Sequence, residues 1–278
     1  MDGPLAGAGR WSWAGLQAGV LLTAGLHAYA VYREDAADLL HRSADLYAAV
    51  GADVHRALAL IFGAGAREHL TGDIETARRG LEEGITLARR AGATNIVASG
   101  LTVWGELERK NGNHERARDI QQESLRIARE TGELRRVAMI TDNLGLIGHH
   151  LGDDETAERM IRESLLLSSE IGFEANAAHA LIALAEQFAL GGDPARAARL
   201  IGAADAYLEQ LGLVAQPADA PDFGRIRAYV SEALGEDVYG CAVVDGEQLG
   251  LERAIDLALS DPASASALAQ PSRHRGTS

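Results

Sequence analysis

Apolar residues recur along most of the chain at the three- and four-residue spacing of amphipathic helices. Leu81, Ile85 and Ala88 mark one apolar face, and Ile161 and Leu165 belong to another. Short turns that contain glycine followed by Asp or Asn separate these segments. Glycine readily takes the left-handed conformation that ends a helix, and an Asp or Asn side chain caps the next one. The pattern therefore predicts pairs of helices joined by tight turns.

The pattern repeats every 40 residues. A shift of this length aligns four turns without a gap, at residues 71–73, 111–113, 151–153 and 191–193. The same shift aligns two further sets of small residues: Ala77, Ala117, Ala157 and Ala197, and Gly92, Gly132, Gly172 and Gly212. A fixed period of this size is typical of solenoids. The sequence thus predicts an all-α fold, an α-solenoid of about five helix hairpins.

We expect this array to span residues 12–212, with hairpins over about 12–51, 53–92, 94–132, 134–172 and 174–212. Residues 213–260 follow the repeats and include a proline-containing linker. They are expected to form a helical cap, since a terminal repeat otherwise exposes its apolar side. The small and polar residues 261–278 are expected to be disordered.

The first predicted helix lies in a stretch without formal charge, from Ser12 to Tyr32, between Arg10 and Arg33. A transmembrane helix or a signal peptide would show the same arrangement. However, Gln17 and other polar residues interrupt the stretch, and its register fits the repeat. A buried packing helix is therefore the favoured interpretation.

Charge and cysteine content narrow the class of protein. The 278 residues include 40 Asp and Glu against 26 Lys and Arg, a net charge of −14, which argues against direct binding to nucleic-acid phosphates. Lys110, the only lysine, lies outside any phosphate-binding loop motif, so this chain holds no Walker-type NTPase domain. Cys241 is the only cysteine, which excludes a disulfide framework and fits a cytoplasmic location without membrane contact.

Candidate catalytic or metal-binding residues are few. His149 and His150 stand close to Asp153 and Asp154, but adjacent side chains on a helix diverge by about 100°, so a solvated helix end is favoured over a metal site. No G-x-S-x-G motif is present, and Cys241 is expected to be a buried thiol. The tryptophans Trp11, Trp13 and Trp104 are expected to pack in the core. We therefore expect no enzyme activity, no metal and no cofactor.

Small residues within each hairpin carry a resemblance to a known family. Gly65, Gly105, Gly145 and Ala185 stand in the middle of the first helices, and Ala77, Ala117, Ala157 and Ala197 stand early in the second helices. In these positions and residue types the chain resembles the tetratricopeptide repeat. The resemblance implies stacked hairpins with closely packed helices, and the period of 40 indicates helices longer than usual.

The end of the array carries a second resemblance. Residues 198–205, 211–213, 233–236 and 251–254 look like the C-terminal repeat region of actinobacterial ATPase-linked (LuxR/STAND-type) transcriptional regulators. The NTPase and helix-turn-helix parts of those proteins are missing from this chain. The resemblance therefore implies an alternative function, in which the chain is a truncated or split regulator and its partner is a separate NTPase or DNA-binding protein.

Stacked hairpins present one stripe of each first helix on a concave face. The repeat frame assigns to this stripe a mixture of charged, polar and apolar side chains: Phe62, His69, Ser99, Thr102, Glu106, Arg109, Asp142, Leu146, His149, His179 and Glu186. This mixture suits an extended peptide or a helix of a partner protein. A hydrophilic inner face without a ligand is the alternative. The sequence thus favours a non-catalytic scaffold that binds a protein or peptide, with a regulatory or sensing role.

Overall fold

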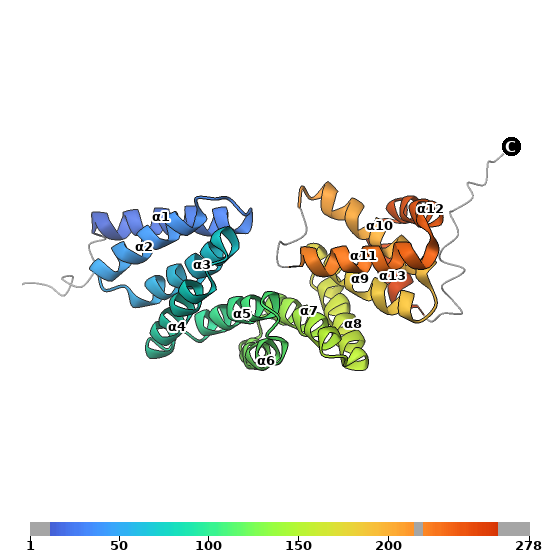
Figure 1. Cartoon of the computed structure of the whole chain (residues 1–278). Coiled ribbons are helices and arrows are strands. Elements are labelled where there is room, and N and C mark those ends of the chain that lie inside the picture. Colours follow the sequence, from blue (N-terminus) through green and yellow to red (C-terminus); the bar gives the residue numbers. More distant parts are fainter. Residues whose placement is uncertain (1–11, 214–218, 261–278) are drawn as a thin grey trace, which may run out of the picture. The chain divides into compact units, whose positions relative to one another are not determined.

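The computed structural model describes residues 12–213 and 219–260, and all regular elements in these ranges are α-helices. They fall into an N-terminal unit that ends at Thr131 and a C-terminal unit that begins at Gly132. The N-terminal unit holds α1 (Trp13–Ala30), α2 (Ala36–Ala49), α3 (Asp53–Thr71), α4 (Ile74–Arg90), α5 (Thr94–Lys110) and α6 (His114–Thr131) (Figure 1).

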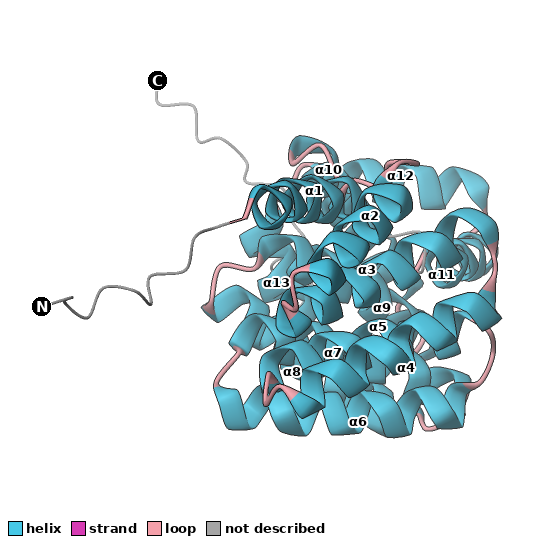
Figure 2. Cartoon of the chain, turned by 90° about the vertical axis from the view of Figure 1, so that its left-hand side faces the viewer, coloured by secondary structure: helices cyan, strands magenta, loops and turns pink. Residues whose placement is uncertain are grey.

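The C-terminal unit holds seven helices among its described residues: α7 (Leu134–His150), α8 (Asp154–Glu170), α9 (Glu174–Leu190), α10 (Pro194–Gln210), α11 (Ala220–Leu234), α12 (Glu236–Glu247) and α13 (Leu251–Leu259). Consecutive helices from α1 to α10 pair as antiparallel hairpins, and short loops join them (Figure 2). The predicted fold class is confirmed: the chain is all-α, with the architecture of a tetratricopeptide-like solenoid. The tail predicted to be disordered lies outside the described residues.

Turn chemistry explains where the helices end. Gly72, Gly152 and the other glycines that follow the repeat helices have φ between 64° and 87°, the left-handed region that residues with a side chain avoid. Asp73, Asp153 and Asp193 then cap the next helix, because the carboxylate of each accepts a hydrogen bond of 3.1 to 3.2 Å from the backbone N–H three residues later.

Close packing within the hairpins requires small residues. A methyl group on Gly145 of α7 would collide with the side chain of Ile161 on α8, and one on Gly105 of α5 would lie 2.6 Å from the Gln121 side chain on α6. The helices of these two hairpins therefore approach to a distance that glycine permits and a residue with a Cβ does not.

A buried carboxylate ties α4, α5 and the turn before α6 together in the N-terminal unit. The side chain of Glu108 on α5 is 0% exposed and accepts hydrogen bonds from Arg78 of α4 (2.7 and 2.9 Å), from Trp104 (2.9 Å) and from Asn113 (2.8 Å). Burial alone would raise the pKa of Glu108, but these hydrogen bonds lower it below its usual value. The predicted core position of Trp104 is thus a half-buried one with a polar partner.

The C-terminal helices close the last hairpin in two ways. Glycines mediate the contact of α12 with α10: a methyl group on Gly202 would strike the backbone of Val243, and one on Gly246 would strike the backbone of Arg199. α13 packs on α9 and α10 and contributes Ala254, Leu257 and other residues to the core.

The first helix differs from the expectation of a buried packing helix. Ala18, Leu22 and Ala28 are buried, but Trp13 is 81% exposed and Val20 also faces solvent. The prediction that Trp13 packs in the core is therefore wrong, and Trp11 lies outside the described residues. Within the described ranges, none of the helices combines the length and the apolar character needed to cross a membrane.

Candidate functional site

The predicted stripe residues of α3 lie against the first hairpin. The half-buried ring of Phe62 meets the ring of Tyr29 edge to face, with centroids 5.4 Å apart. The ring of His69 lies 5.3 Å from that of Tyr32. Burial lowers the pKa of His69, and the positive charge of Lys110 adds to this shift. Phe62 thus packs on α1, and His69 packs on the turn that follows α1.

The predicted stripe residues of α5 are less accessible than expected. Thr102 is 4% exposed, and its hydroxyl lies 3.0 Å from that of Ser124 on α6 while donating to the carbonyl of Ala98. Ser99 is also buried and donates to the carbonyl of Asn95. Thr102 therefore joins α5 to α6 and exposes little of its side chain to a partner.

Charged residues surround the end of α5. Glu106 is half-buried and Arg109 is buried. Lys110, the only lysine of the chain, binds Glu68 of α3 through contacts of 2.8 and 3.0 Å. In the N-terminal unit, the ends of α3 and α5 therefore bring aromatic, acidic and basic side chains together.

The predicted stripe residues of the C-terminal unit are buried rather than open. Asp142 and Leu146 of α7 and His179 of α9 are each almost fully covered, and Leu146 belongs to the apolar core. The ring of His179 meets that of Phe223 from α11 edge to face, with centroids 5.6 Å apart. Burial lowers the pKa of His179. Helix α11 therefore covers a stripe that the repeat frame assigns to a partner.

His149 at the end of α7 lies between two carboxylates. Its Nε2 is 2.8 Å from Oε2 of Glu186 on α9, and its Nδ1 is 2.8 Å from Oδ1 of Asp154 at the start of α8. A protonated imidazole donates from both nitrogens and satisfies both contacts. The hydrogen bond with Glu186 raises the pKa of His149 above its ordinary value, although burial opposes this shift.

Glu186 also accepts two hydrogen bonds from Arg225 of α11, one of them 3.1 Å between Nη2 and Oε2. Its side chain is 8% exposed. Burial would raise the pKa of Glu186, but the bonds from His149 and Arg225 lower it. Next to this pair, Nε2 of His150 lies 2.7 Å from Oδ1 of Asp222, which is also on α11. Two residues of α11 thus meet two residues of the repeats, Arg225 through an ion pair with Glu186 and Asp222 through a hydrogen bond with His150.

The helix end at His149 and His150 is solvated only in part, because His149 is half-buried between its carboxylate partners while His150 is exposed. The two rings have different acidic partners, as their divergence on the helix implies. No group of His, Cys, Asp and Glu suited to holding a metal ion occurs within the described residues. Cys241 of α12 is exposed, so the expectation of a buried thiol is also wrong.

Sequence reasoning missed Asp222 and Arg225. The apolar residues Phe223, Ile226 and Val230 lie at helical spacing and are all buried, which was a readable signal for an amphipathic helix. The pattern does not reveal which surface such a helix covers, because α11 stands outside the repeat frame.

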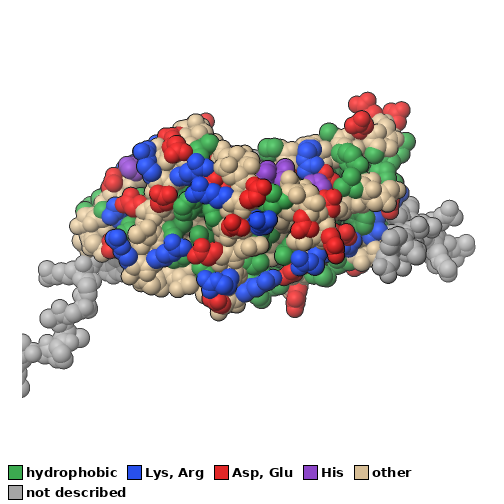
Figure 3. All heavy atoms as spheres, turned by 60° about the horizontal axis from the view of Figure 1, so that its bottom comes forward, with side chains coloured by type: hydrophobic (Ala, Val, Ile, Leu, Met, Phe, Trp, Pro, Cys, Tyr) green, Lys and Arg blue, Asp and Glu red, His purple; other side chains and the backbone are tan. Residues whose placement is uncertain are grey.

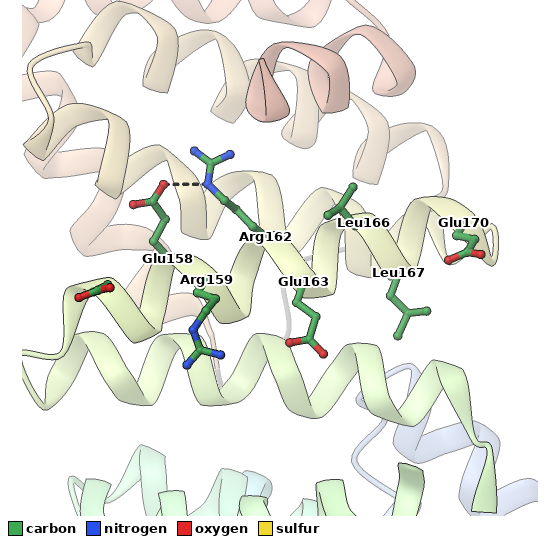
Figure 4. A pocket seen from close by; sticks show the side chains of 8 residues that line it. Glu158, Arg159, Arg162, Glu163, Leu166, Leu167 and Glu170 are labelled. Atoms are coloured by element: carbon green, nitrogen blue, oxygen red, sulfur yellow. Dashed lines mark hydrogen bonds and ion pairs between the residues drawn. The ribbon is translucent and has the colours of Figure 1, made fainter. Parts of the chain in front are cut away.

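An open hollow of about 660 Å³ lies along α8 and is lined by residues of that helix alone (Figure 4). Glu158 and Arg162 point to one side of it and form an ion pair of 2.7 Å, while Arg159 and Glu163 point to the other. On the molecular face in Figure 3, acidic and basic side chains are interspersed. The hollow is formed by one helix, whereas the site at the end of α7 combines side chains of α7, α9 and α11.

Comparison with known proteins addresses the fold. Residues 97–165 match the family model described as a tetratricopeptide repeat, and no curated protein matches the sequence. The chain is similar to the crystal structure of BtubC (BKLC) from P. vanneervenii, with 18% identity and a TM-score of 0.55 over 88% of this chain and 94% of that one. Neither match names an ATPase or a transcriptional regulator. The comparisons support a tetratricopeptide-repeat protein with an all-α solenoid fold.

Proposed function

We propose that this protein is a non-catalytic, cytoplasmic scaffold that binds a partner protein or peptide through the inner stripe, the residues that the repeat frame assigns to one face of α3, α5, α7 and α9. The main observation in support of this proposal is the position of α11. A helix from outside the repeats lies on the inner stripe of α9 and contacts His179 and Glu186. This part of the stripe therefore has the shape and chemistry to hold a helix.

The contacts of α11 correspond to a general mode of recognition, in which an amphipathic helix lays its apolar face on a repeat surface. Phe223, Ile226 and Val230 supply the apolar face, and all three are fully buried. Arg225 and Asp222 lie at its edge and pair with Glu186 and His150. Apolar anchors supply most of the affinity in such contacts, and the charges fix register and direction.

The N-terminal unit offers a second stretch of the inner stripe with related chemistry. Tyr32, Phe62 and His69 are half-buried, so part of each ring reaches the surface. Aromatic rings beside charged groups are typical of residues that dominate protein interfaces. This supports a contribution of Phe62 and His69 to partner binding.

We propose more specifically a regulatory or sensing role. A helix of the same chain covers part of the stripe, so the access of a partner to the stripe can be regulated. The alternative, a truncated or split ATP-dependent transcriptional regulator, depends on the resemblance of residues 198–205, 211–213, 233–236 and 251–254 and on no other match. The intact mass of the protein from its native cells separates these versions. A mass near 29.4 kDa supports an independent scaffold, and a much larger chain supports a regulator.

The test of the proposal is capture of partners from native cells with matched baits. Phe62→Ala with His69→Ala alters the inner stripe of the N-terminal unit, and Glu186→Ala alters that of the C-terminal unit. Leu166→Ala with Glu170→Ala changes the outer hollow along α8 as a control. We expect a stoichiometric protein partner with the wild type and the control, and its loss with at least one inner variant that keeps wild-type circular dichroism. A partner that all inner variants retain and the control loses would overturn the proposal.

A further inference from the structure

Helix α11 packs on the repeats but does not belong to the repeat frame. The repeat frame ends at Gly212, and α11 matches none of its positions. Its contacts nevertheless fall on the residues that the frame reserves for a partner: Phe223 on His179, and Arg225 on Glu186. Asp222 reaches further, past α9 to His150 of α7.

We propose that α11 occupies the partner site of the C-terminal unit in cis, and that the partner presents an amphipathic helix of the same chemistry. This inference rests on the proposed function and names its partner class. The recognised pattern is an acidic residue, an aromatic residue directly after it and an arginine two positions further, followed by aliphatic residues, as in Asp222, Phe223, Arg225, Ile226 and Val230. The partner helix binds when α11 leaves.

The way α11 is held allows it to leave without dismantling the unit. Its outer side faces solvent, with Tyr229 38% exposed. Helices α12 and α13 have contacts of their own with α10, and the backbone approach of Gly202 and Gly246 does not involve α11. At the junction with α12, Gly235 has a φ of 79° and no atom within 4 Å of the position of a side chain. This glycine can serve as a hinge.

Two polar contacts set the direction in which a helix enters the site. Glu186 and His150 are on the repeats, so a visiting helix must bring its arginine to Glu186 and its acidic residue to His150. A helix in the opposite direction would place the acidic residue near Glu186. One further pair, Arg227 with Asp205 of α10 at 2.5 Å, ties α11 to the repeats and adds to its local concentration at the site.

The experiment uses the full chain and a fluorescent synthetic peptide of residues 219–235, the sequence of α11. Arg225→Glu in the chain places two carboxylates together and should release α11, while Glu186 stays intact for the peptide. We expect the peptide to bind this variant at least tenfold more tightly than the wild type, because a competitor in cis reduces apparent affinity by the fraction of open sites. Glu232→Arg, a charge reversal on the exposed side of α11, is the matched control and should behave like the wild type.

Two further sets of variants distinguish the release of α11 from a folding defect. Phe223→Ala in the chain should also raise peptide affinity, whereas the same change in the peptide should abolish binding. The charge swap Arg225→Glu with Glu186→Arg should restore the closed state and weak binding. If the peptide binds neither the Arg225→Glu nor the Phe223→Ala chain while circular dichroism stays that of the wild type, α11 is a permanent part of the fold and the inference is wrong.

The partner captured from native cells separates this inference from the proposed function. We expect that partner to bind the Arg225→Glu chain more tightly than the wild type and to compete with the peptide. A partner that needs the inner stripe but binds both chains equally would overturn the role of α11 and leave the scaffold function standing. A concentration-dependent dimer with exchanged α11 helices would also overturn occupation in cis.

Discussion

Single glycines decide how closely the helices of a hairpin approach. A methyl group on Gly145 would collide with Ile161 and approach the carbonyl oxygen of Ala157, whereas one on Gly148, a turn further along α7, would meet Ala157 at an ordinary 3.4 Å. We predict that Gly145→Ala lowers the free energy of unfolding by about 1–3 kcal/mol through overpacking. Gly148→Ala should leave it unchanged or raise it by up to about 1 kcal/mol, since alanine favours the helix. Urea unfolding of both variants checks this, and equal effects would contradict it.

The titration of His149 predicts a dependence of stability on pH. Its pKa is raised above the ordinary 6.5, so its pair with Glu186 stabilises the fold fully below pH 6.5 and loses this effect as pH rises through the raised pKa. The pKa of Glu186 is lowered from 4.5, so the pair also weakens as pH falls through that lowered pKa. The pair therefore contributes most between these two ordinary values.

We predict that the free energy of unfolding of the wild type declines more between pH 6.5 and about pH 9 than that of His149→Gln. Burial lowers the pKa of His179, and this residue is the same in both proteins, so it does not obscure the comparison. Chemical unfolding at both pH values measures the difference. Parallel declines in the two proteins would show that His149 is not held protonated by Glu186.

At the residue scale, the sequence predicts the stripe positions but not their accessibility. The repeat period assigns Thr102, His179 and Glu186 to one face, yet Thr102 binds Ser124 within its hairpin and the other two are covered by α11. Periodicity gives the direction of a side chain along its own helix. It carries no information about a helix outside the period that packs on the same face.

At the scale of elements, turn chemistry is readable in advance because it is local. The carboxylate of Asp153 accepts from the N–H of Thr156 at 3.2 Å, as the turn pattern predicts. We predict that Asp153→Ala lowers the free energy of unfolding by about 1 kcal/mol, while Asp153→Asn, which keeps a capping oxygen, changes it little. Thermal unfolding followed by circular dichroism compares the two. An equal loss in both would show that charge, rather than the cap, is what matters.

The element that sequence reasoning placed incompletely is α11. Short helices after the linker were expected to cover the last hairpin, and α12 and α13 pack there. In addition to α10, helix α11 contacts the inner stripe of α9 and His150 of α7. Its apolar spacing predicts a buried face but does not indicate which surface that face covers. The contacts with Glu186 and His150, which fix the position of α11, depend on single residues of that helix.

At the scale of whole units, repeats are joined by contacts that cross from one hairpin to the next. Arg78 of α4 provides two hydrogen bonds to the buried Glu108 of α5. We predict that Arg78→Ala lowers the free energy of unfolding by about 3 kcal/mol, because it leaves a buried carboxylate without its main partner. Arg126→Ala, which removes an exposed ion pair with Glu130, should cost less than about 1 kcal/mol.

Glu108→Gln added to Arg78→Ala should recover part of the loss, because an amide is cheaper to bury than a charge. Urea unfolding of the three variants provides the comparison. If Arg78→Ala and Arg126→Ala cost the same, the tie between α4 and α5 is not a major contribution to the stability of the N-terminal unit.

The fold as a whole is the most predictable level, because its signal is repeated. Four turns and two sets of small residues agree on one period, so an irregularity at a single position does not disturb the assignment. The partner site is the feature that the sequence predicts least well. It depends on single, unrepeated residues such as Arg225, and one sequence offers no second copy against which to check them.

The most direct test of the scaffold account is hydrogen–deuterium exchange of the protein bound to its captured partner, compared with the free protein. The account predicts slower exchange in α7 and α9 on binding, faster exchange in α11 as it leaves His179 and Glu186, and little change in the outer helix α8. Protection confined to α8, with α7, α9 and α11 unchanged, would contradict it.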